Sequence, residues 1–144
     1  MTELDAADAL RVGDRVELRF PARGDLVVLA RLVTSAISAR AGFDIEELED
    51  LRLAVGELCL LAMGGGVNRQ GELCLEFSVS GEAIDVSCTL AGAAGVSRAP
   101  GDEVSEADRL GEQILSALVD EYGREQDDGS SRSWLRKQRR GHGA

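Results

Sequence analysis

The pattern of apolar and polar positions predicts a long amphipathic helix near the middle of the chain, over residues 45–63. Asp44 precedes this helix and Glu47 follows three residues later, which is the pattern of a capping box. From residue 53 onward the helix is apolar on nearly every side except at Glu57, so we expect other parts of the protein to cover it on more than one face. The residues that recur at helical spacing are Leu48, Leu51, Val55, Leu58 and Ala62.

Shorter patterns on either side predict a sheet and two further helices. Alternation of apolar and polar residues predicts four strands, the first of which ends at Pro21: residues 15–20, 73–79, 84–90 and 131–138. Helical spacing predicts helices over residues 25–40 and 109–122. The inward residues of the second are predicted to be Leu110, Ile114, Ala117 and Leu118. Residues 91–105 and 126–130 are rich in small and polar side chains, and we expect loops there.

Length and charge limit the classes of protein to consider. A chain of 144 residues with 44% hydrophobic content suits one domain. We expect an N-terminal segment over 1–12, a domain over 13–138 and a flexible basic tail over 139–144. A net charge of -10 disfavours non-specific binding to nucleic acids or anionic membranes, because both would repel most of the surface. The same charge suits a basic partner.

The cysteines and the N-terminus indicate a cytoplasmic protein. Cys59, Cys74 and Cys88 stand singly in apolar runs, with no CxxC pair and no nearby histidine. We therefore expect core thiols in a reducing compartment and no metal site. The N-terminus is acidic and lacks an apolar core of the kind found in signal peptides, and no apolar run is long enough to span a bilayer.

Glu57 is the candidate for chemistry within the long helix. The residues alone allow two interpretations: a solvent-facing strip shared with Asp50 and Ala54, or a carboxylate lining a polar pocket. The run 49–63, EDLRLAVGELCLLAM, resembles the N-box helix of the GHKL ATPases, in particular that of the bacterial anti-sigma serine kinases. In that family the motif reads approximately Glu-Ala-x-x-Asn-Ala, and here it stands as Glu57-Leu58-Cys59-Leu60-Leu61-Ala62.

The order of predicted elements also matches this family from residue 15 to about 138. The resemblance implies an α+β two-layer sandwich of the GHKL or Bergerat type, with helices packed on one face of a mixed, mostly antiparallel sheet. It implies that Glu57 is a general base. It also implies that an asparagine, which binds magnesium in the family, is replaced here by Leu61, and leucine has no oxygen for a hard cation.

Two further nucleotide boxes depart from the family pattern. The aspartate that accepts the adenine amino group falls at Leu90, and only Gly92 and Gly95 match the glycines that follow it. The Gly-Leu-Gly-Leu opening of the last helix stands here as Arg109-Leu110-Gly111-Glu112, which keeps only its second and third residues. We predict that Leu61 and Leu90 are buried in the space that a nucleotide occupies in active relatives.

The resemblance, closest to actinobacterial members with eroded nucleotide boxes, implies a regulator of transcription. The first hypothesis is an anti-sigma factor that binds a sigma factor, an anti-sigma antagonist or both as a homodimer, with kinase activity weak or lost. No cofactor is expected under this hypothesis. The alternatives are an active serine kinase with an unusual pocket, whose cofactors would be ATP and Mg²⁺, and a GHKL-fold binding protein with another partner. The resemblance also implies that Arg31 contacts the sigma factor and its antagonist. The residues alone equally allow an outward arginine whose stem covers the core.

Overall fold

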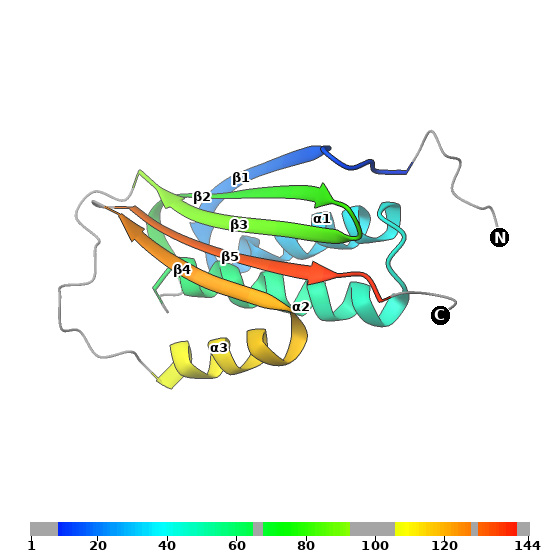
Figure 1. The fold of residues 1–144 in the computed structure, drawn as a ribbon. Coiled ribbons are helices and arrows are strands. Elements are labelled where there is room, and N and C mark those ends of the chain that lie inside the picture. Colours follow the sequence, from blue (N-terminus) through cyan, green and yellow to red (C-terminus); the bar gives the residue numbers. More distant parts are fainter. Residues whose placement is uncertain (1–8, 65–67, 93–105, 128–129, 141–144) are drawn as a thin grey trace.

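Three helices lie along one face of a five-stranded sheet (Figure 1). The computed structural model describes residues 9–64, 68–92, 106–127 and 130–140. In chain order the elements are β1 (Arg15–Arg23), a short 3-10 turn (Gly24–Leu26), α1 (Val27–Arg40), α2 (Ile45–Ala62), β2 (Asn68–Ser80), β3 (Ala83–Ala91), α3 (Glu106–Leu118), β4 (Glu121–Asp127) and β5 (Ser130–Gln138).

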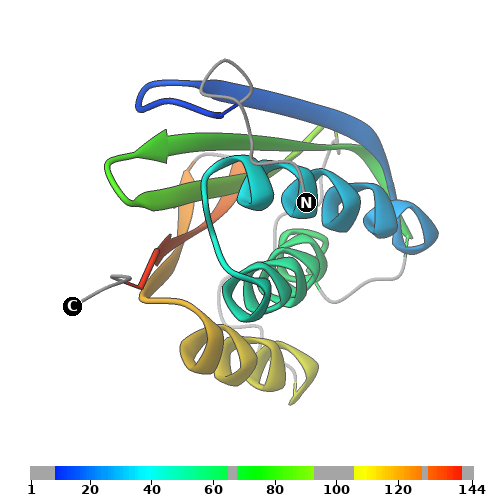
Figure 2. The ribbon, with the colours of Figure 1, turned by 90° about the vertical axis from the view of Figure 1, so that its right-hand side faces the viewer.

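The sheet has the strand order β1-β2-β3-β5-β4, with β1 and β4 at its edges. All four pairings are antiparallel, which refines the mixed sheet that the resemblance implied. The helices lie side by side with α2 between α1 and α3, as the end-on view in Figure 2 shows. The two-layer α+β architecture expected from the sequence is confirmed.

The core forms where the inward face of the sheet meets α2. Alternate residues of β2, including Leu73, Leu75 and Phe77, are buried, as the predicted alternation requires. Leu51 and Leu58 of α2 are fully buried in the same cluster. This central helix therefore has sheet on one side and a helix on each flank, which explains why its second half is apolar on most sides.

The capping box at the start of α2 is confirmed and extends to the last strand. Asp44 accepts a hydrogen bond from the Glu47 backbone, and the Glu47 carboxylate accepts one from the Asp44 backbone. The other Glu47 oxygen accepts the backbone N–H of Arg140. Because Glu47 is completely buried, this carboxylate joins the first turn of α2 to the chain segment that follows β5.

Basic residues at the end of β5 make further contacts with the helices. Lys137 is buried and donates to the carbonyl of Leu118 at the end of α3, at 2.7 Å, with Asp50 of α2 at 3.8 Å. Arg140 pairs with exposed Glu46 at 3.5 Å. Arg139 donates its backbone N–H to the carbonyl of Glu82 at 2.7 Å. Residues 139 and 140 of the predicted tail therefore contact the folded domain. Residues 141–144 lie outside the described residues, as do residues 1–8 of the predicted N-terminal segment.

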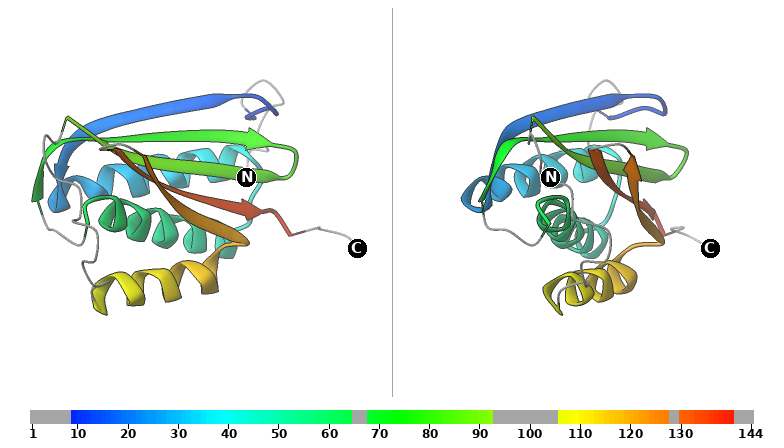
Figure 3. Two further views of the ribbon diagram at one scale, coloured as in Figure 1. Left: turned by 60° about the vertical axis from the view of Figure 1, so that its left-hand side comes forward. Right: turned by 90° about the vertical axis from the view of Figure 1, so that its left-hand side faces the viewer.

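Several predicted boundaries were wrong. β2 begins at Asn68, before the predicted residue 73, and residues 126 and 127 of the predicted loop belong to β4. β1 continues through Pro21 to Arg23, because an edge strand tolerates a residue that donates no hydrogen bond, and its register shifts just after the proline. The last helix spans Glu106–Leu118, not 109–122. Residues 121 and 122 belong instead to β4, which follows α3 directly at the edge of the sheet (Figure 3).

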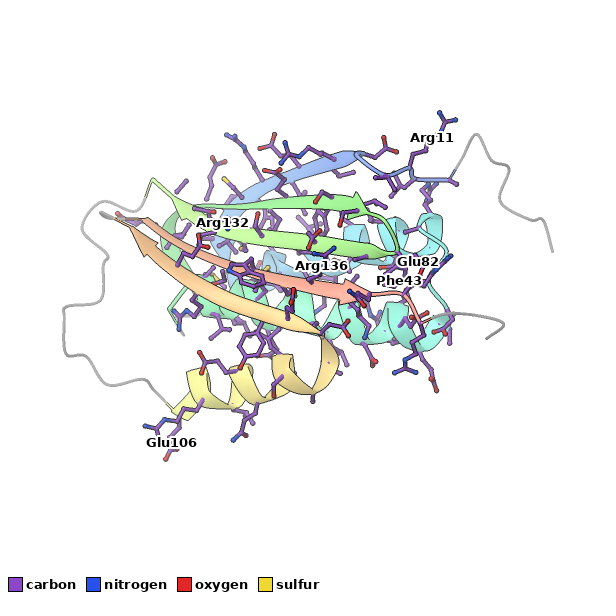
Figure 4. The ribbon with its side chains drawn as sticks, in the orientation of Figure 1. Arg11, Phe43, Glu82, Glu106, Arg132 and Arg136 are labelled. Carbon is purple, nitrogen blue, oxygen red and sulfur yellow. The ribbon has the colours of Figure 1, made fainter. Side chains whose placement is uncertain are left out.

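The face of the sheet opposite the helices is polar and internally paired. Arg132 and Arg136 of β5, labelled in Figure 4, lie on this open face. Arg132 pairs with Glu125 at 3.3 Å, and Arg136 lies 3.7 Å from Asp85. A shallow hollow on this face is lined by Arg132, Glu125, Asp85 and Trp134, among other residues. Since its charges are already paired with one another, the hollow is a weak candidate for a binding site.

No helix in the described part of the chain combines the length and the apolar character that crossing a membrane requires.

Candidate functional site

Glu57 lies where α2 meets α3, beside Gly111. A Cβ atom added to Gly111 would lie 3.2 Å from a Glu57 carboxylate oxygen and 3.6 Å from a methyl carbon of Leu61. Glu57 and Leu61 are one helical turn apart, so both face the same neighbouring helix. The structure therefore brings together three residues that the sequence assigned to two separate nucleotide boxes.

The solvent-strip interpretation of Glu57 does not fit the structure. Ala54 is completely buried, and Asp50 is half-buried near Lys137. Glu57 itself is half-buried at the boundary between two helices. Within the part of the chain that the structure describes, its carboxylate has no hydrogen bond or ion pair. Glu57 is therefore an unpaired carboxylate, within the described residues, at the packed interface between α2 and α3.

Leu61 is buried, with 3% of its surface exposed, which confirms the predicted burial of this side chain. Its side chain packs against Gly111, and its backbone carbonyl accepts a hydrogen bond from Arg124 of β4 at 3.4 Å. A hydrocarbon side chain in this position supplies no ligand to Mg²⁺, which requires oxygen ligands in octahedral geometry. The residues present therefore do not fit the magnesium ion that the resemblance implies here.

The residues predicted as the second nucleotide box lie at the end of β3. Leu90 pairs in register with Leu73 of β2 and is half-buried, so the prediction of burial holds only in part. Gly92 follows in an exposed position with a φ of 78°, a conformation that glycine adopts without strain. Gly95 and the rest of residues 93–105 lie outside the described residues.

The α3 segment predicted as the third nucleotide box has an inward face that differs in part from the predicted one. Leu110 is 58% exposed and Ala117 is also exposed, whereas Gly111 and Leu115 are buried. The predicted Ile114 and Leu118 are half-buried, and Leu118 packs against the core. The prediction missed Gly111, which has no side chain and lies close to Glu57 and Leu61. Arg109 is exposed beside Leu110.

Arg31, the residue expected to contact a partner, lies between α1 and α2. It is half-buried, and atoms of its guanidinium group lie next to Gly56 of α2. Val28 and Leu32 on α1 and Leu53 on α2 are 48%, 62% and 51% exposed. The sequence did not single out Gly56, although it directly precedes Glu57 and is the only glycine of α2.

The cysteines give no sign of reactivity. Cys59, Cys74 and Cys88 are free thiols, and the first and last are buried in the core between α2 and β3. A hydrogen bond with the Cys59 thiol, together with burial, raises the pKa of Cys88 well above its ordinary value. This thiol therefore stays protonated and behaves as a small core side chain.

Comparison with known proteins decides the family. Residues 20–137 match the family described as histidine kinase-like ATPase domain. The chain belongs to this family. Among curated proteins, the histidine kinase-like domain is similar to those named serine-protein kinase RsbW. It is 32% identical over 75 residues to the RsbW of Bacillus velezensis and to that of Bacillus subtilis, covering 51% of this chain and 47% of each relative.

A third relative agrees with this assignment, and a solved structure agrees with the fold. The RsbW of Listeria innocua is 33% identical over 75 residues, which cover 51% of this chain and 48% of the relative. The domain thus spans about half the length of the curated relatives it matches. The crystal structure of the RsbU and RsbW domains of Rv1364c from Mycobacterium tuberculosis superposes with a TM-score of 0.63 at 15% identity, over 88% of this chain and 32% of that one. At that identity the likeness shows the fold.

Proposed function

We propose that this histidine kinase-like domain is an anti-sigma factor that binds an RNA polymerase sigma factor, an anti-sigma antagonist or both, and that its kinase activity is weak or lost. The proposal places it in the cytoplasm as a homodimer, which sedimentation equilibrium would test. One observation carries the loss of catalysis: Leu61 is buried against Gly111 where the family resemblance requires a magnesium ligand.

The other two nucleotide positions support this part of the proposal. At Leu90 a hydrocarbon side chain replaces the adenine acceptor, and an amino group left without a partner in a pocket costs roughly 1 to 3 kcal/mol. On α3, Glu112 adds a negative charge near the place where phosphates would lie in the family. One such change could be compensated elsewhere, but these changes affect the expected contacts to the magnesium ion, to the adenine ring and to the phosphates together.

The surface around Arg31 supports the binding part of the proposal. Exposed apolar side chains are typical of interfaces, and several occur near half-buried Arg31 in the sequence of the two helices. Val28 and Leu32 lie one turn apart on α1, and Leu53 lies one turn before Gly56 on α2. Arginine is enriched among interface hot spots and pairs bidentately with carboxylates. The acidic net charge of the chain is also suited to a basic DNA-binding partner.

The test uses the sigma factors encoded in the same genome, each purified and titrated against this protein. We expect one of them to bind, and we expect Arg31→Ala to weaken that complex by at least ~2 kcal/mol, or roughly 30-fold, without changing the melting temperature by more than a few degrees. Arg40→Ala removes an exposed arginine from the end of the same helix and serves as the control, with unchanged affinity expected. Equal affinities for both variants would show that the interface lies on another face.

A second candidate function, an active serine kinase, is favoured by the retained carboxylate of Glu57. If it is correct, the protein transfers phosphate from Mg-ATP to a serine of the antagonist, and Glu57→Ala abolishes turnover while leaving nucleotide binding intact. Our proposal predicts instead no measurable transfer and weak or absent Mg-ATP binding. Calorimetry that detects micromolar, magnesium-dependent ATP binding would favour the kinase.

A further inference from the structure

Gly56 occupies an unusual place in α2, directly beneath the guanidinium group of Arg31. A Cβ atom added to Gly56 would lie 2.6 Å from Nε, 2.7 Å from Nη2 and 3.0 Å from Cζ of Arg31. Carbon atoms do not approach other heavy atoms this closely without a bond, so any side chain at position 56 would displace the arginine. The guanidinium therefore rests on the backbone of α2, in space that only a glycine leaves open.

Helical conformation does not explain a glycine here. Gly56 lies in the interior of α2 and is absent from the residues with positive φ among those the structure describes. An ordinary helix interior favours alanine over glycine, because glycine loses more conformational freedom on folding. The close contact with Arg31 is the feature of the structure that requires a residue without a side chain at position 56.

The guanidinium group of Arg31 keeps its N–H donors available for a partner. Within the described residues Arg31 forms no hydrogen bond or ion pair through its side chain, although it is half-buried. The nearby arginine of α2 differs, since Arg52 lies one turn before Gly56 and pairs with Glu49 at 2.5 Å. Of these two arginines, Arg31 is the one whose charge has no partner within the described chain.

We propose that Gly56 is a positioning residue for partner recognition: it seats Arg31 on α2 so that a carboxylate in an otherwise apolar segment of the partner binds a guanidinium already held in place. This inference rests on the proposed function of the Arg31 surface. Holding the group before binding reduces the side-chain entropy that the complex must lose, and the planar fork of arginine suits a carboxylate. The exposed Val28, Leu32 and Leu53 supply the apolar contacts around the pair.

The first arm of the test measures unfolding and needs no partner. Melting temperatures are compared for the wild type, Gly56→Ala, Arg31→Ala and the double variant. In the Arg31→Ala background we expect Gly56→Ala to raise the melting temperature by about 2 to 3 °C, the usual gain from alanine in a helix interior. In the wild-type background this gain should be absent or reversed, because the new methyl group displaces Arg31. Equal changes in both backgrounds would overturn the inference.

The second arm measures affinity for the sigma factor that binds the wild type. We expect Gly56→Ala to weaken binding roughly tenfold in the wild-type background. In the Arg31→Ala background it should change the affinity less than about twofold. A purely structural effect of the alanine would act equally in both, and that outcome, or no effect in either, would refute the positioning role. If neither a sigma factor nor an anti-sigma antagonist binds the wild type, the proposed function fails, and the unfolding arm alone decides whether Gly56 seats Arg31.

Discussion

Replacing Leu61 by asparagine tests whether the position of the magnesium ligand has become part of the core. The substitution restores the residue type that the family resemblance expects one turn after Glu57. In an open nucleotide pocket an asparagine would face water and cost little. In this structure it would face Gly111 and the neighbouring core with only 3% of the leucine surface exposed.

The expected cost follows from that burial. Truncating a buried leucine costs roughly 2 to 5 kcal/mol. An amide left without hydrogen-bond partners in the same space costs about 1 to 3 kcal/mol more, partly offset because asparagine refills some of the volume. We therefore expect Leu61→Asn to destabilise the protein by ~3 to 5 kcal/mol, a large share of the roughly 5 to 15 kcal/mol that holds a domain of this size together.

Urea unfolding followed by circular dichroism measures this loss, and Leu53→Asn is the matched control. Leu53 lies on the same helix and is 51% exposed, so the control shares the change in helix propensity but little of the burial. We expect the control to cost ~1 kcal/mol or less. If Leu61→Asn costs no more than Leu53→Asn, or if it creates magnesium-dependent ATP binding without loss of stability, the pocket is open and our reasoning about Leu61 is wrong.

Two further predictions concern stability. Glu47→Ala should cost ~2 to 4 kcal/mol in urea unfolding, because the backbone N–H groups of Asp44 and Arg140 lose a buried acceptor. The control, Glu46→Ala, removes the exposed neighbouring carboxylate and should change the free energy of unfolding by less than ~0.5 kcal/mol. Equal losses of stability in the two variants would argue against the buried junction. The raised pKa of Cys88 keeps its thiol protonated in the folded state, so the free energy of unfolding should be unaffected by this group below the unfolded pKa of about 8.5 and should fall by up to ~1.4 kcal/mol per pH unit above it. When unfolding is measured from pH 7.5 upward, the free energy of unfolding should decline less steeply for Cys88→Ala than for the wild type. Identical declines would rule out this contribution.

The elements with strong periodicity were predictable from the sequence. The capping box and the apolar spacing predict α2, and the alternation of apolar and polar residues predicts β2 and β3. β4 was missed because EYGREQD contains a single apolar residue, Tyr122, and gains its strand conformation from pairing with β5. The residues before it continue α3 without an obvious stop signal, so the pattern alone placed its first two residues in the helix.

Features of the candidate site could be predicted only where the identity of a single residue determines them. The missing oxygen at Leu61 can be read directly from the sequence, and the structure adds that the side chain is buried. The contact of Gly111 with Glu57 and the contact of Gly56 with Arg31 could not be read in this way. Both depend on how closely two helices approach, and a glycine in a helical pattern does not reveal which neighbour uses the space it leaves.

The central claim is that this domain binds a sigma factor, an anti-sigma antagonist or both without needing a nucleotide. Its most direct test is a calorimetric titration of the purified protein with each sigma factor and each anti-sigma antagonist of the same genome, in buffer with and without Mg-ATP. We predict that at least one of these proteins binds with the same dissociation constant in both buffers. Binding that appears only with Mg-ATP, or no binding by any of these proteins in either buffer, would contradict the account.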